Sequence, residues 1–232
     1  MTIEEMHVTF RELGQQMGIQ TTRAIFSENI DICINFAIDA KARSILRENV
    51  GMSFSDKVAR DNAKVSPING LYTLYTHDKV SGDAIKGAGT KYEPYNVILN
   101  SDDVYLYTGF DCAYSDNDIV HCRLIERESL YDTLDDFCNR PTKRYPVVAV
   151  NGNKANLVVD VYTGTTDNPA KPAAIIYTYI RKPATVILDE ENPENSVNCD
   201  LPEHLHKDIV TDAVNYYLQS LSSKQGDAGS QT

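Results

Sequence analysis

The spacing of apolar residues changes twice along the chain, and this limits the fold more than any other feature of the sequence. Before residue 51 and after Asn192, apolar residues recur at steps of three and four, the period of a helix with one buried side. Residues 66 to 188 carry short β-branched and aromatic runs separated by Gly, Pro, Asn and Asp. The sequence therefore predicts helices at both ends of the chain and β-strands between them.

Two helices are expected in the N-terminal part. Thr2 and Glu5 have the spacing of a capping box, which predicts a first helix with a narrow apolar stripe. The second helix is expected to begin at Ser27 as N-cap and to stop before Gly51. We expect the two to form an antiparallel hairpin. The first stripe is Ile3, Met6, Phe10, Leu13 and Met17, and the buried side of the second helix is Ile30, Cys33, Ile34, Ala37, Ile38 and Ile45.

The middle of the chain predicts antiparallel strands. The pair Asn151-Gly152 between two of them is typical of a hairpin turn. One helical segment is expected among the strands, at Ser129 to Phe137. The expected strands are Leu71 to Tyr75, Val97 to Leu99, Val104 to Tyr107, Ile119 to Glu126, Val147 to Val150, Leu157 to Tyr162, Ile175 to Ile180 and Val186 to Leu188.

A broad apolar face after Pro202 predicts a last helix, with Asp200 as its N-cap. This face needs partners, and the stripes of the N-terminal helices are the nearest candidates. We therefore expect an α+β fold in which the N-terminal helices and the C-terminal helix form a helical bundle with an inserted antiparallel β-rich domain. The expected parts are an N-terminal helical part (1–65), a β-rich insertion (66–190), a C-terminal helix that completes the bundle (191–221) and a polar tail (222–232).

Composition limits the classes of partner. The chain has 22 Lys and Arg against 33 Asp and Glu, a net charge of −11, so a basic surface that grips nucleic acid is not expected. No stretch approaches the ~18 uninterrupted apolar residues of a membrane span, and Glu4 and Glu5 stand where a signal peptide would carry Lys or Arg. The five cysteines are scattered without a C-x-x-C pair, which is typical of free thiols in a reducing compartment.

The motifs for catalysis are incomplete. Gly82 and Gly87 have the spacing of a phosphate loop, but Ala88 stands where that loop requires Lys. The run Gly51 to Ser55 resembles a nucleophile elbow without its second glycine. The run Asp116 to Asp118 lacks the glycine and terminal glutamate of an EF-hand, so an acidic surface loop is the better interpretation. We expect no enzymatic activity and no cofactor.

The histidines offer no metal pair. His204 and His206 are two residues apart, which on a helix turns their side chains roughly 200° from each other. His121 and Cys122 point to opposite faces of a strand, and His7 has no partner at metal spacing. We expect isolated histidines at surface or interface positions, and no bound metal.

Five stretches of the chain carry a resemblance to a known family: Met1 to Phe10, the helix around Ile30 to Ala40, Tyr131 to Pro141, Tyr179 to Pro183 and Asn198 to His206. They resemble virion structural proteins of crAss-like bacteriophages, in particular the ring or adaptor proteins found where the tail joins the portal. The predicted order of helices, β-region and a helix that opens at Leu201-Pro202-Glu203 is consistent with such adaptors. Cys138 departs from the pattern, at a position where a thiol is not expected.

The resemblance implies a head-to-tail connector subunit of the virion neck, assembled in the host cytoplasm. It implies a dodecameric ring that docks on the portal, contacts further tail or ring proteins and lines the channel through which genomic DNA passes without sequence-specific binding. Carboxylates facing that channel would repel phosphates over a Debye length of roughly 10 Å. Acidity that only keeps the free subunit soluble is an equal alternative.

The polar tail holds the partner-binding residues that we predict, for the portal or an adjacent subunit: Ser222, Ser223, Lys224, Gln225, Gly226 and Asp227. Such a tail buries little apolar area, so polar contacts with a neighbouring chain must order it. Two other classes of function are open from the sequence. One is a β-rich binding module for a host protein or a glycan, mounted on the helices, and the other is a hydrolase that uses dispersed carboxylates.

Overall fold

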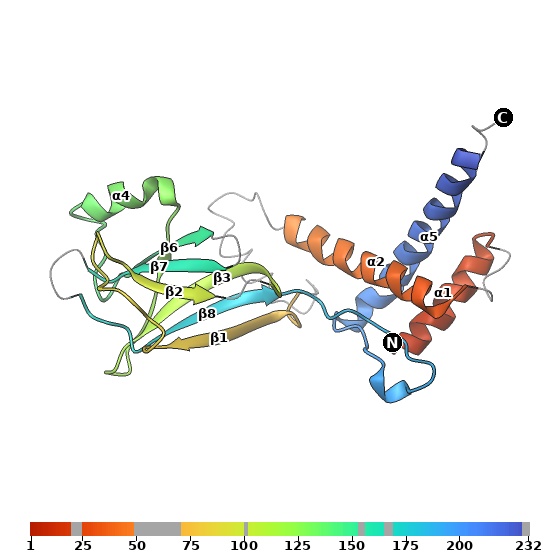
Figure 1. Cartoon of the computed structure of the whole chain (residues 1–232), viewed down its shortest axis with the longest axis horizontal. Helices are drawn as coiled ribbons and strands as arrows, with labels where there is room; N and C mark the ends of the chain where they lie inside the picture. Colours follow the sequence, from red (N-terminus) through yellow and green to blue (C-terminus); the bar gives the residue numbers. More distant parts are fainter. Residues whose placement is uncertain (20–24, 49–70, 100–101, 153–155, 165–168, 229–232) are drawn as a thin grey trace. The chain divides into compact units, whose positions relative to one another are not determined.

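The protein has a mixed α and β fold. A computed structural model describes residues 1–19, 25–48, 71–99, 102–152, 156–164 and 169–228. The chain divides into a helical unit, Met1–Leu74 with Lys182–Thr232, and a β unit, Tyr75–Arg181 (Figure 1). The predicted α+β class is confirmed, and the β unit is shorter at both ends than the predicted 66–190.

The described elements of the helical unit are α1 (Ile3–Gln16), α2 (Ser27–Glu48), the 3-10 turns η3 (Pro193–Asn195) and η4 (Glu203–Leu205), and α5 (His206–Ala228). α1 begins with the predicted capping box: Thr2 Oγ1 accepts a hydrogen bond from Glu5 N at 3.2 Å, and the Glu5 carboxylate accepts one from Thr2 N at 2.9 Å. Both α1 and α2 contact α5 more extensively than they contact each other. α5 therefore lies at the centre of the unit and packs against both N-terminal helices, as its broad apolar face predicts, whereas the predicted hairpin partners α1 and α2 contact each other little.

Apolar side chains of the three helices form the core of this unit. Phe10 is fully buried, and the centroid of its ring lies 6.0 Å from that of Tyr217 in an edge-on contact. The prediction for Met17 is wrong: it is 44% exposed, because α1 ends at Gln16 and Met17 is the C-cap. His7 is buried on the stripe instead. Further buried apolar residues are Ile3, Met6, Ile30, Ile34, Ala37, Ile38, Ala42, Ile209, Val210, Ala213 and Val214.

Both ends of the C-terminal helix differ from the prediction. Asp200 does not cap it, because its carboxylate oxygens accept hydrogen bonds from Ala184 N at 3.2 and 3.4 Å, and η4 precedes α5. At its other end α5 continues to Ala228 instead of ending at Leu221. Residues 222–228, predicted as the start of a polar tail, thus have a helical backbone, and the structure describes nothing of their side chains.

In its described part, the β unit contains two four-stranded sheets. The first has the order β1 (Tyr75–Ser81), β8 (Ala174–Arg181), β3 (Val104–Ala113) and β4 (Ile119–His121), and all its neighbours are antiparallel. The second has the order β2 (Tyr95–Leu99), β7 (Leu157–Tyr162), β6 (Val147–Gly152) and β5 (Arg123–Leu124). Only β5 and β6 run parallel among the described pairs, which corrects the prediction of antiparallel pairing throughout.

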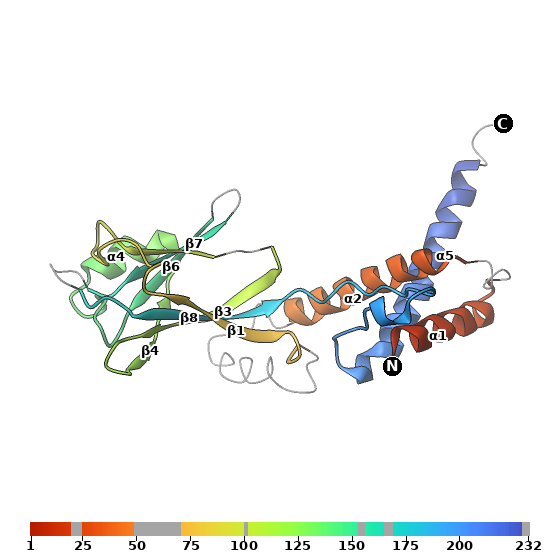
Figure 2. The same cartoon turned by 60° about the horizontal axis from the view of Figure 1, so that its bottom comes forward.

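Side chains alternate between the two faces of the second sheet, so each face contributes to a separate apolar cluster. Val148 and Val159 join Phe110 of the first sheet in the main core, which is thus shared by both sheets. Val147 and Ala149 lie on the other face of β6 and pack with buried leucines of α4 (Arg127–Asp135), which lies beside this strand (Figure 2). This helix occurs close to its predicted place.

The predicted strand Ile119 to Glu126 is divided, because the chain changes sheets at Cys122. Cys122 N donates to Phe110 O of the first sheet at 2.8 Å, and Arg123 N donates to Pro146 O, beside the second sheet, at 2.9 Å. Such a corner lets one strand contribute to two packed sheets.

Two other β predictions also need correction. The strand predicted at Leu71 to Tyr75 begins only at Tyr75, and the preceding residues form a turn that belongs to the helical unit. The predicted hairpin between β6 and β7 exists, but Asn151 and Gly152 are still paired, with Val158 and Leu157. Asn151 and Gly152 therefore belong to the paired strand and are not the predicted turn.

Candidate functional site

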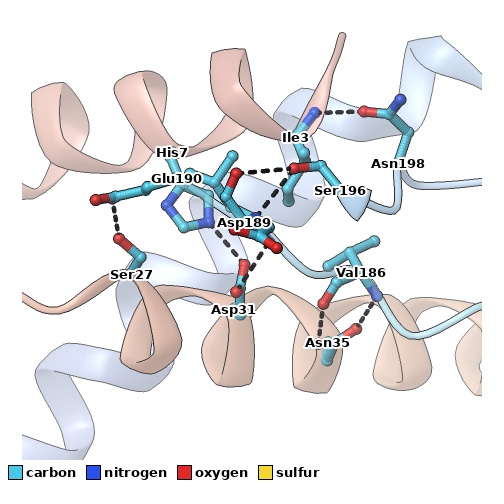
Figure 3. Close-up of polar contacts among 11 residues, drawn as sticks. Ile3, His7, Ser27, Asp31, Asn35, Val186, Asp189, Glu190, Ser196 and Asn198 are labelled. Atoms are coloured by element: carbon cyan, nitrogen blue, oxygen red, sulfur yellow. Dashed lines mark hydrogen bonds and ion pairs between the residues drawn. The ribbon is translucent and has the colours of Figure 1, made fainter. Parts of the chain in front are cut away.

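The segment between β8 and α5 forms a strap across the helical unit, defined here as residues 182–200. Asn35 of α2 holds it through two hydrogen bonds: Asn35 Nδ2 donates to Val186 O at 2.9 Å, and Val186 N donates to Asn35 Oδ1 at 2.8 Å (Figure 3). From α1, Ile3 N donates to Asn198 Oδ1 at 2.8 Å. The predicted strand Val186 to Leu188 is reduced to an isolated antiparallel bridge between Ile187 and Val197, because side chains of α2 bind the backbone of Val186 and Leu188 on either side of it.

A buried histidine and a buried aspartate join both helices to the strap. His7 Nε2 lies 2.8 Å from Asp31 Oδ1, and Leu188 N donates to Asp31 Oδ2 at 3.1 Å (Figure 3). An ionised carboxylate can only accept, so with Asp31 in that form the proton of this bond would lie on His7 Nε2. A single carboxylate thus connects α1, α2 and the strap at a buried position, where an unpaired partner would be costly.

The next residues of the strap form a compact turn around Asp189. Its carboxylate accepts hydrogen bonds from Asn192 N at 2.8 Å, Glu191 N at 3.0 Å and the Asn195 side chain at 3.3 Å. These bonds, led by that from Asn192 N, hold the pKa of Asp189 below its usual value. Beside this turn, Ser27 Oγ donates to the Glu190 carboxylate (Figure 3).

A hollow of about 490 Å³ lies between α1 and the strap. Its walls include His7 and Arg11 from α1 and Asp189 and Glu190 from the strap. His7 Nδ1 and Arg11 Nε are buried and have no hydrogen-bond partner among the described residues. An imidazole oriented by a carboxylate is half of an acid–base pair, but catalysis of acyl transfer also needs a nucleophile bonded to the free nitrogen. No described side chain supplies one, and Ser27 is bonded to Glu190.

The positions of two histidines differ from the prediction that they lie at the surface or at an interface. His7 and His206 are buried, not on the surface, and His206 Nε2 bonds to Leu201 O at 2.7 Å. His121 pairs with Asp111 at 2.7 Å, on the exposed face of its strand. Within the described ranges, no group of three or more His, Cys, Asp or Glu side chains is placed to hold a metal ion.

Other residues considered from the sequence have structural partners. Lys143 forms ion pairs with Asp116 and Asp118, and its hydrogen bond lowers the pKa of Asp116. Cys112 Sγ and Cys122 Sγ lie 3.3 Å apart in the main core, so two of the scattered cysteines are neighbours. Their mutual hydrogen bond, followed by burial, raises the pKa of Cys122. The run Gly51 to Ser55 lies outside the described residues.

The predicted partner-binding residues lie at the end of α5. The helix includes the backbone of residues 222–227. By contrast, the sequence interpretation missed the pair of His7 and Asp31. A signal was present: His7 lies between Met6 and Phe10 on the apolar stripe, and a polar residue on a buried face needs a partner.

Comparisons of the sequence with models of known protein families and with curated proteins find no match. As far as the chain is described, none of its helices combines the length and the apolar character needed to cross a membrane.

Proposed function

We propose that this protein is a structural subunit of a bacteriophage head-to-tail connector ring, an adaptor that docks on the portal and lines the DNA channel. The subunit would be a helical bundle, built from both ends of the chain, that carries the β unit as an insertion. It would assemble with copies of itself, as a dodecamer, in the virion neck. The resemblance of several stretches to crAss-like phage ring proteins motivates the proposal.

The observation that carries it is a second apolar face on α2. Ile34 and Ala37 are buried in the helical unit, whereas Ile32 and Phe36, on the opposite side of the helix, are 66% and 61% exposed. The Phe36 and Tyr216 rings make an edge-to-face contact, with centroids 5.0 Å apart. Two large apolar side chains exposed one turn apart on a helix, here beside the charged Asp39 and Arg43, are typical of a surface that another protein chain covers. A neighbouring chain would cover this second face.

The strap supports the same role. A ring subunit transmits load between neighbours, so the helices that carry the contact must keep their arrangement. The Asn35 and Asp31 hydrogen bonds tie α2 to the strap, and Asp31 also ties it to α1. The exposed face of α2 therefore belongs to a preorganised unit, which lowers the conformational cost of association.

The test is self-assembly of the purified protein, alone and with the portal protein, followed by analytical ultracentrifugation and electron microscopy. The Phe36→Glu variant should remain folded by circular dichroism and lose assembly, because a charge on this face cannot be buried. Tyr92→Glu, which changes an exposed aromatic residue of the β unit, is the matched control and should assemble normally. Wild-type protein that stays monomeric under all of these conditions would refute the ring.

The C-terminal residues are tested separately. Deleting Ser222 to Thr232 should leave the subunit folded and weaken its attachment to the portal or to the next subunit. Truncated protein that joins particles at normal occupancy would exclude this role for the segment.

A further inference from the structure

An arginine–aromatic patch stands out on the β unit of this acidic chain, defined by Arg123, Phe137, Arg140 and Tyr145. Phe137 and Tyr145 are 79% and 64% exposed. The Arg140 guanidinium lies over the Phe137 ring, 4.9 Å from its centroid. The four residues line a hollow of about 420 Å³. Large aromatic residues and arginine are the residues most enriched where proteins bind one another.

The loop that carries the patch is ordered by its own hydrogen bonds. The Asp136 carboxylate accepts from Cys138 N at 2.9 Å and from the Asn139 side chain, and Arg140 N donates to Asp136 O at 2.9 Å. Farther on, Tyr145 N donates to Thr142 O at 3.0 Å. The patch is thus preformed, and a partner need not order it.

The charge of the hollow points to an acidic partner. Its described lining contains Arg123 and Arg140 and no carboxylate, although the chain as a whole has a net charge of −11. Arg123 Nη2 donates to Asn139 O at 2.5 Å, whereas Arg123 Nε is buried and has no partner in the part of the chain that the structure describes. A guanidinium presents its donors in a planar fork that matches a carboxylate.

The helical unit carries a surface of complementary chemistry, an acidic turn formed by residues 190–194. Glu191, Pro193 and Glu194 are exposed. The Asp189 carboxylate fixes the backbone of the turn by accepting hydrogen bonds from Glu191 N and Asn192 N. The turn therefore presents two carboxylates and a rigid proline ring. The carboxylates match the two arginines, and the proline ring can pack against Phe137 or Tyr145.

We propose that the arginine–aromatic patch of one copy binds the acidic turn of a neighbouring copy. This inference rests on the proposed ring, for which it supplies a specific contact. Two different surfaces of the same chain pair head to tail, and such heterologous contacts close into rings when the rotation between copies allows it. Both surfaces are preformed and opposite in charge, which favours a second copy over a partner of unknown charge.

Charge reversal tests the contact in the full-length protein. Arg140→Glu and Glu194→Arg should each weaken self-assembly at least about tenfold, because each places like charges against each other. The two variants mixed, or the double variant Arg140→Glu/Glu194→Arg, should regain assembly, since every contact is again between opposite charges. Arg144→Glu and Glu12→Arg, exposed residues outside both surfaces, are the matched controls and should assemble as the wild type does.

The outcomes separate this contact from the ring itself. If the wild type forms rings and the single reversals do so equally well, or if the double variant fails to regain assembly, the contact is overturned and the ring stands. If Arg140→Glu loses only portal binding, the patch serves the portal and the proposal is again overturned. Wild-type protein that never assembles overturns both. Circular dichroism confirms the folding of each variant.

Discussion

The helical unit and the β unit are specified by different kinds of contact. Of the four buried polar residues in the described part of the chain, three belong to the helical unit, namely His7, Asp31 and His206, and only Thr163 belongs to the β unit. Neighbouring strands pair through backbone hydrogen bonds, and these bonds set their register. Helices satisfy their backbone internally, so directional contact between them must come from side chains. In this protein the hydrogen bonds of the His7–Asp31 pair and of the strap are the directional contacts between the helices.

The largest expected effect tests the core of the helical unit. Phe10→Ala should lower the free energy of unfolding by about 3 to 5 kcal/mol, because it leaves a cavity where α1 meets α5. Val8→Ala, which removes an exposed side chain from the same helix, is the control and should have little effect. Chemical denaturation followed by circular dichroism measures both. Equal stability of the two variants would mean that α1 does not depend on this packing.

The next prediction tests how much the buried pair of His7 and Asp31 contributes to the stability of the helical unit. Asp31→Asn keeps the shape of the side chain but removes the charge that accepts from His7 and Leu188, and we expect a loss of about 1.5 to 3 kcal/mol. Asp39→Asn on the same helix breaks an exposed pair with Arg43, for which about 0.5 kcal/mol or less is expected. Similar losses for both would show that the buried pair does not specify the helical unit.

The next prediction concerns the backbone conformation at Gly87 in the β unit. Gly87 has φ +100°, and a Cβ there would lie 2.0 Å from Pro94 O, so Gly87→Ala should cost about 1 to 3 kcal/mol through strain. At Gly152 no atom lies within 4 Å of the same position, so Gly152→Ala is the control, with an expected change near zero. Thermal unfolding of the two variants compares them. If Gly87→Ala is as stable as the wild type, the positive φ and the close approach of Pro94 O do not require glycine at this turn.

The smallest effect appears only at alkaline pH. Burial raises the pKa of Tyr162 and of Tyr177 in the β unit to about 12. A raised pKa in the folded state means that the associated stability is complete below pH 10 and is lost as the pH rises from 10 to 12. Burial raises the pKa of Cys199 in the helical unit from 9.0 to about 11, which sets an earlier window there.

Denaturation at successive alkaline pH values, with tyrosinate absorbance recorded alongside, checks this difference. Tyr162→Phe should reduce the loss in the upper window, and Cys199→Ala should reduce it in the lower one. If neither variant alters the profile, burial of these groups does not govern the alkaline stability of either unit.

Local signals predicted much of the fold. The capping box at Thr2, the beginning of α2 at Ser27 and the bounds of β7 follow from spacing and residue type within a few positions. Errors arose where a distant segment determines the structure. Cys122 interrupts a strand because two sheets share it. The segment at Val186 is an isolated bridge and not a full strand, because Asn35 binds the backbone of Val186.

The sequence by itself determined the mixed fold class, most of the helices and strands, and the acidic character of the protein, because periodicity, capping and charge are properties of neighbouring residues. Only the tertiary structure decided that His7 meets Asp31, 24 positions away, and that Leu188 completes the same site. It also decided that Arg123, Phe137, Arg140 and Tyr145 line one hollow. The physical reason is that local patterns state which face of an element is buried, whereas its partner is chosen by the packing of the whole chain.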